Sequence, residues 1–71
     1  MRIHSTALVA IRSKDGLTQL DLAGRADVSQ SYLSELEKGR KADVSPAVAR
    51  RLANALAVPL SAITLPPDDQ S

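Results

Sequence analysis

Two short helical patterns lie between residues 18 and 37, with room for only a tight turn between them. Their apolar positions follow helical spacing on either side of the turn and are Leu22, Ala23, Ala26, Val28, Leu33 and Leu36. Ala23 is small, and we expect two helices to cross closely there. Because both stripes must be buried against a shared core, the pattern predicts a pair of short helices inside a small all-α domain.

Composition narrows the kind of core and the chemistry that the chain can support. With 71 residues, 44% of them hydrophobic and Tyr32 as the one aromatic residue, we expect one domain whose core is built from Leu, Val, Ile and Ala. The lack of cysteine excludes disulfides and thiolate chemistry, and the single His4 cannot form a zinc site alone. We therefore expect no metal and no cofactor.

No apolar run approaches the ~20 residues of a membrane span, and the first residues lack the apolar segment of a signal peptide. The expected location is the cytoplasm, with no membrane partner. We expect the domain to cover residues 1–65 and residues 66–71, rich in Pro and Asp, to form a disordered tail.

Start and stop signals predict five helices. Thr18, Ser29 and Ser45 are expected N-caps, and Ser5 is a further candidate cap. The expected helices run from residue 5 or 6 to about 14, from 19 to about 26, from 30 to 38, from 46 to 56 or 57, and from 60 to 65. Gly16 and Gly39 are expected stops, and Asp27 occupies the turn.

The helix over residues 30–38 divides its side chains between two faces. Leu33, Leu36 and Glu37 point one way, and the opposite face carries Ser31, Ser34, Glu35 and Lys38, with Gln30 on the first turn. A Gln amide matches the N6 and N7 edge of adenine, Ser hydroxyls fit any base or a phosphate, and a carboxylate accepts from cytosine N4. These residues alone leave open the alternative of an ordinary solvated helix face.

Two further features favour a polyanionic partner. Gln19 is the first residue of its helix, where backbone N–H groups and the helix dipole attract anions. Lys38, Arg40 and Lys41 form a local basic cluster in a chain whose net charge is only +1. Ordinary solubilising charge is the alternative explanation for this cluster.

The combined pattern resembles the Cro/phage-repressor (XRE-like) helix-turn-helix family. The matching residues are Leu17-Thr18-Gln19-x-x-Leu22-Ala23, Val28-Ser29-Gln30-Ser31-Tyr32-Leu33-Ser34-x-Leu36-Glu37-x-Gly39 and Leu52-Ala53-x-Ala55-Leu56-Ala57-Val58-Pro59. The resemblance implies a compact five-helix, lambda-repressor-like DNA-binding domain whose recognition helix covers residues 30–38. It implies that Gln30, Ser31 and Glu35 read bases. The expected phosphate contacts are Gln19, Ser29, Tyr32, Ser34, Lys38, Arg40 and Lys41.

The sequence departs from the family pattern at three places. Asp27 stands where the turn commonly has Gly, the loop after Gly39 is one residue longer than is common, and Leu20 takes a position that is commonly charged. The family often pairs an Arg late in its first helix with a Glu late in its third. We therefore expect a structural Arg12–Glu37 salt bridge between these two helices.

The resulting hypothesis is a sequence-specific regulator of transcription that binds double-stranded operator DNA, as a repressor of the Cro-like or immunity type. A homodimer, formed in solution or only on DNA, would use Leu60, Ile63, Leu65 and the outer face of the fourth helix, although these residues could instead seal the core. The alternative is a protein-binding module of the antitoxin or excision-factor type, which uses the same fold. An enzyme is rejected, because the sequence offers no nucleophile–base set and no Gly-rich phosphate loop.

Overall fold

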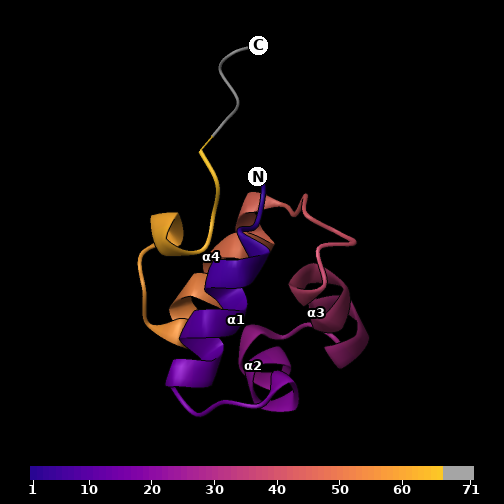
Figure 1. The fold of residues 1–71 in the computed structure, drawn as a ribbon, viewed down its shortest axis with the longest axis vertical. Coiled ribbons are helices and arrows are strands. Elements are labelled where there is room, and N and C mark those ends of the chain that lie inside the picture. Colours follow the sequence, from indigo (N-terminus) through magenta and orange to yellow (C-terminus); the bar gives the residue numbers. More distant parts are fainter. Residues whose placement is uncertain (67–71) are drawn as a thin grey trace.

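The computed structural model describes residues 1–66, in which four α-helices and one turn of 3₁₀-helix pack together (Figure 1). These elements are α1 (Ser5–Lys14), α2 (Gln19–Ala26), α3 (Gln30–Glu37), α4 (Pro46–Leu56) and η1 (Leu60–Ala62). The all-helical class is as expected, but the fifth predicted helix over residues 60–65 is wrong. After η1 the chain becomes extended, and Thr64 pairs with Ile3 in an isolated β-bridge.

The N-terminal ends of the helices follow the predicted capping in three cases of four. The side chains of Thr18, Ser29 and Ser45 each accept a hydrogen bond from the backbone N–H three residues later. The predicted cap at Ser5 is wrong, because Nδ1 of His4 accepts the N–H of Ala7 at 3.2 Å. Ser5 is instead the first residue of α1.

Two helices end on a residue with a side chain in the left-handed region. Asp27, the predicted turn residue, has φ 59° and ψ 47°, a conformation that Asp tolerates better than most residues. Ala57 ends α4 at φ 57° and ψ 43°, which the sequence did not predict. Helix α3 ends at Glu37, one residue earlier than expected, and Gly39 follows with φ 80°.

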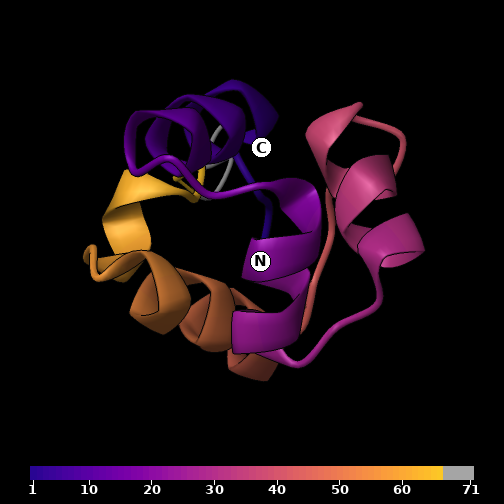
Figure 2. The same cartoon turned by 90° about the horizontal axis from the view of Figure 1, so that it is seen from below.

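The core is aliphatic, and α2 lies in its middle. Helix α2 packs against both α3 and α4, and α1 packs against α3 (Figure 2). Ala23 is 2% exposed, in line with the close crossing expected there. Ile63 is fully buried, so it seals the core and does not offer the dimer contact considered above. The 13 buried core residues are Ile3, Leu8, Leu22, Ala23, Ala26, Leu33, Leu36, Val44, Ala49, Leu52, Ala53, Leu56 and Ile63.

Three extended segments meet beside the helices, and sequence analysis predicted none of these contacts. Residues 1–4 lie between residues 42–44 and residues 63–65, joined by backbone hydrogen bonds on both sides. This arrangement buries Ile3. The expected disorder of the tail concerns residues that, apart from Pro66, lie outside the described part of the chain. None of the helices in residues 1–66 has the length and hydropathy to cross a membrane.

Candidate nucleic-acid interface

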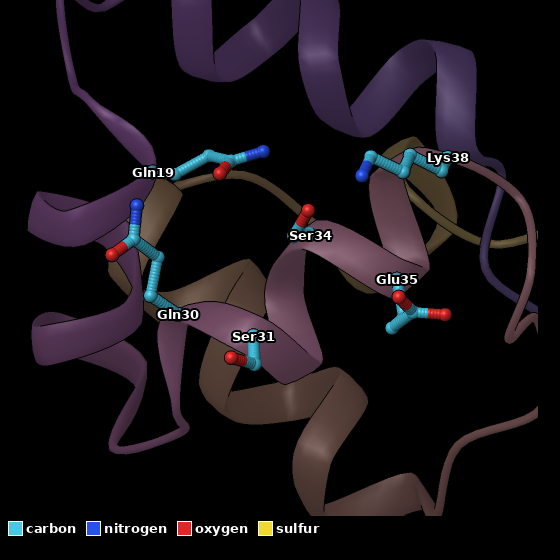
Figure 3. A pocket seen from close by; sticks show the side chains of 6 residues that line it. All are labelled: Gln19, Gln30, Ser31, Ser34, Glu35 and Lys38. Carbon is cyan, nitrogen blue, oxygen red and sulfur yellow. The ribbon is translucent and has the colours of Figure 1, made fainter.

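Six of the predicted site residues line one open groove between the start of α2 and the outer face of α3. The groove has a volume of about 350 Å³ and is lined by Gln19, Gln30, Ser31, Ser34, Glu35 and Lys38. Figure 3 shows the two Gln amides next to each other at one end and Glu35 and Lys38 towards the other. The side chains offer amide, hydroxyl, carboxylate and ammonium groups, a mixed set of hydrogen-bond donors and acceptors.

Packing fixes which face of α3 turns towards this groove. Leu33 and Leu36 are fully buried, so rotation of the helix about its axis would expose them. Ser31 is consequently exposed, while Ser34 and Glu35 are half-buried, and all three line the groove. The two faces expected from the sequence are therefore both present.

A polar network ties α1 to the inner side of α3. Nε of Arg12 donates to Oε2 of Glu37 at 2.6 Å, and Nη2 donates to Oε1 at 2.9 Å. The side chains of Arg12 and Glu37 are only 15% and 5% exposed. Nη1 of Arg12 also donates to the carbonyl oxygen of Leu17 at 2.8 Å. One guanidinium therefore links α1 both to α3 and to the segment between α1 and α2. The ion pair expected from the sequence is thus present, with bidentate geometry and with both side chains largely shielded from solvent.

Gln19 connects this network to the groove. Its Nε2 donates to Oε1 of Glu37 at 2.9 Å, while the same side chain lines the groove with Gln30. Sequence reasoning placed Gln19 near a phosphate and missed this bond to Glu37. The two residues are 18 positions apart on different helices, and no local pattern signals their contact.

The remaining predicted residues lie around the groove rather than in it. Ser29 uses its Oγ to cap α3, accepting from the N–H of Tyr32 at 3.0 Å, and Tyr32 is half-buried against the core. Arg40 and Lys41 are exposed in the loop after α3, and their backbone N–H groups both donate to the carbonyl oxygen of Glu35, at 3.0 and 3.3 Å. The structure therefore separates them from the six groove residues but keeps their backbone next to α3.

The start of α2 carries a carboxylate that is already engaged. Asp21 accepts the N–H of Thr18 at 3.1 Å, and its own N–H donates to the Thr18 hydroxyl, which completes a capping box. The backbone and hydroxyl of Thr18 lower the pKa of Asp21 below its usual range. Among residues 1–66, no three His, Cys, Asp or Glu side chains come together as a metal site would need.

Comparison with known proteins gives a family and several similar folds. A family model described as helix-turn-helix (HTH_3) matches residues 8–63. The restriction-modification controller protein C.AhdI from Aeromonas hydrophila is 29% identical, with a TM-score of 0.77 over 82% of this chain and 86% of that protein. The clp gene regulator ClgR from C. glutamicum is 38% identical, with a TM-score of 0.73 over 80% of this chain and 73% of that chain.

A hypothetical transcription factor, NHTF from Neisseria, has the same fold, with a TM-score of 0.79 at 24% identity. The superposition covers 93% of this chain and 75% of that one. No curated protein sequence matches the chain. The family resemblance drawn from residues 17–59 is confirmed by the family match.

Proposed function

Because this chain belongs to the helix-turn-helix family, we propose that it is a sequence-specific DNA-binding regulator of transcription that inserts α3 into the major groove. We further propose that it acts as a repressor of the Cro-like or immunity type, which occupies its operator. C.AhdI is a controller protein and ClgR a gene regulator, and both likenesses extend over most of this chain.

One observation carries the proposal: the outer face of α3 has polar side chains that the protein itself does not use. Within residues 1–66, the side chains of Gln30, Ser31, Ser34, Glu35 and Lys38 make no hydrogen bond to another residue. Burying such groups in a complex is favourable only where the partner supplies hydrogen bonds. The edges of bases in the major groove supply them, and Gln30, Ser31 and Glu35 are the residues proposed to read them.

Residues around the groove are proposed to hold the two phosphate backbones. Gln19 and Ser29 stand at the N-termini of α2 and α3, where backbone N–H groups attract phosphate. Gln19 is proposed to contribute its backbone N–H together with the second N–H of its side-chain Nε2, since only one N–H of that amide donates to Glu37. The further phosphate contacts in this proposal are Tyr32, Ser34, Lys38, Arg40 and Lys41.

A dimer on two half-sites is the proposed form of the complex, with half-sites about one helical turn of DNA apart. The buried Ile63 does not take part, which leaves Leu60, Leu65 and the outer face of α4 as the contact. Leu65 is 37% exposed and lines an apolar groove that the exposed Met1 also lines. An inverted repeat in the bound DNA would be the signature of this arrangement.

Selection of bound sequences from a random pool of double-stranded DNA tests the proposal. The wild-type protein should enrich one sequence, and a Gln30→Ala, Ser31→Ala variant should enrich a sequence relaxed at the base pairs those residues read. The matched control is Thr6→Ala, Ser13→Ala, which changes two exposed residues of α1 outside both the groove and the proposed dimer contact and should keep the wild-type preference. If the wild-type protein enriches no sequence over the input pool, the proposed function is wrong.

A further inference from the structure

The loop that carries Arg40 and Lys41 is held at both of its ends. At one end, the N–H groups of Arg40 and Lys41 donate to the carbonyl oxygen of Glu35 in the last turn of α3. At the other end, the N–H of Ile3 donates to the carbonyl oxygen of Ala42 at 2.8 Å, and the N–H of Val44 donates to that of Met1 at 2.8 Å. The loop that carries the two basic residues therefore runs from the end of α3 to the N-terminal segment (Figure 1).

The N-terminal segment, residues 1–4, is itself fixed from its other side. The N–H of His4 donates to the carbonyl oxygen of Ile63 at 2.8 Å, and the N–H of Leu65 donates to that of Arg2 at 2.9 Å. Ile3, in the middle of the segment, is only 3% exposed. The segment is thus hydrogen-bonded on both sides, between residues 63–65 and the loop after α3.

We propose that the N-terminal segment is a positioning element for DNA binding, which holds the loop so that Arg40 and Lys41 face the phosphate backbone. This inference rests on the proposed function and adds a role that lies away from the groove. A free loop would lose conformational freedom when its side chains engage phosphate, which weakens binding. The backbone bonds to Ile3 and Met1 order the loop before DNA arrives.

The experiment compares two substitutions at Ile3. Ile3→Ala and Ile3→Pro both shorten the buried side chain, but only Pro also removes the N–H that donates to Ala42. DNA affinity is measured across salt concentrations, since the slope reports the number of phosphate contacts. We expect Ile3→Pro to bind roughly tenfold more weakly than Ile3→Ala and to lose about one unit of slope per released basic residue.

The same pair of variants in an Arg40→Ala, Lys41→Ala background shows whether the effect passes through the loop. There, Ile3→Pro and Ile3→Ala should bind DNA equally. The inference would be overturned if the two Ile3 variants had equal salt slopes in the original background. It would also be overturned if their difference in affinity were undiminished in the Arg40→Ala, Lys41→Ala background. If Arg40→Ala, Lys41→Ala itself leaves the slope unchanged, the phosphate contacts of the proposed function have failed instead.

Two further measurements test the inference, one in the absence of DNA and one with variants that contain no new proline. Amide hydrogen exchange of Arg40 and Lys41 in the free protein should be faster in Ile3→Pro than in Ile3→Ala. If Ile3→Pro does not fold, as judged by circular dichroism, the exposed bridge partners Arg2 and Asp43 are both replaced by Cys.

Antiparallel bridge partners lie about 4.5–5.5 Å apart between Cα atoms, within the range of a disulfide. The chain has no other cysteine, so oxidation joins only these two positions. Relative to the reduced form, the oxidised protein should show slower exchange at Lys41 and DNA binding that is at least as tight. Weaker DNA binding after oxidation would mean that the loop must leave the N-terminal segment to bind, and the inference would be wrong.

Discussion

The two faces of α3 use polar side chains in opposite ways. On the inner face, the carboxylate of Glu37 accepts three hydrogen bonds, two from Arg12 and one from Gln19, beside the fully buried Leu33 and Leu36. On the outer face, the polar side chains that line the groove have no such partners within residues 1–66. One eight-residue helix thus carries both a structural polar contact and a surface left for a partner.

This difference separates stability from binding along the same helix. A carboxylate that loses its partners inside the protein stays shielded from water without compensating bonds. Changes on the inner face should therefore lower the free energy of unfolding. A polar residue on the outer face is solvated in the free protein, and its replacement changes stability by only about ±0.5 kcal/mol. The variants below test this division from its strongest expected effect to its weakest.

Arg12→Ala should have the largest effect, on the inner face. It leaves the 5%-exposed Glu37 side chain without its guanidinium, which should lower the free energy of unfolding by about 3–5 kcal/mol. Urea unfolding followed by circular dichroism measures the loss. Arg25→Ala, which removes an exposed Arg near the end of α2, is the control and should unfold close to wild type. An Arg12→Ala protein as stable as that control would show that the buried ion pair contributes little.

Gln30→Ala should show the reverse behaviour on the outer face. We expect unchanged unfolding and a loss of about 1–3 kcal/mol in binding to the selected sequence, because one bidentate amide contact to a base is removed. Titration with the selected DNA and with random DNA separates base reading from general affinity, and Ser13→Ala, an exposed change on α1, serves as the control. An equal loss on both DNAs would mean that Gln30 reads no base.

The contacts that sequence analysis predicted are those with a local signal. The cap residues Thr18 and Ser29 and the turn residue Asp27 act on neighbours within a few positions, so composition and spacing indicate them. The two faces of α3 follow from helical periodicity alone. The Arg12–Glu37 pair joins residues 25 positions apart, and only the family resemblance suggested it.

The contacts that sequence analysis missed depend on segments far apart in the chain. Ile3 gives no periodic signal, and its burial depends on pairing with residues 42 and 64. The same pairing draws residues 63–65 out of the helix expected there, since extended backbone can bond to residues 2–4 and a helix cannot. The Gln19–Glu37 bond is similar, because it needs α2 and α3 to be already docked.

Ser29→Ala should have a smaller effect than either preceding variant, at the point where both faces of α3 begin. Loss of the hydroxyl that accepts the N–H of Tyr32 should lower stability by about 1 kcal/mol. Ser29→Thr is the matched comparison, because it keeps a hydroxyl that can accept the same N–H, and it should lose only a few tenths of a kcal/mol. Thermal unfolding of both variants measures this, and equal losses would mean that the hydroxyl bond is not what stabilises the start of α3.

The smallest effect concerns Asp21. Its side chain is exposed, but like that of Glu37 it accepts a hydrogen bond from another residue of the protein. Its pKa is lowered in the folded protein by the backbone and hydroxyl of Thr18, so its contribution to stability is present above the unfolded value of about 3.9. That contribution should fade as the pH falls below this value through the folded pKa, because protonation ends the charged capping bond. Urea unfolding of wild type and Asp21→Asn between about pH 6 and 2 should therefore give a difference that narrows with acid. A difference that stays constant over this range would mean that the charge of Asp21 plays no part, and that an internal hydrogen bond on an exposed residue does not act as the buried ones do.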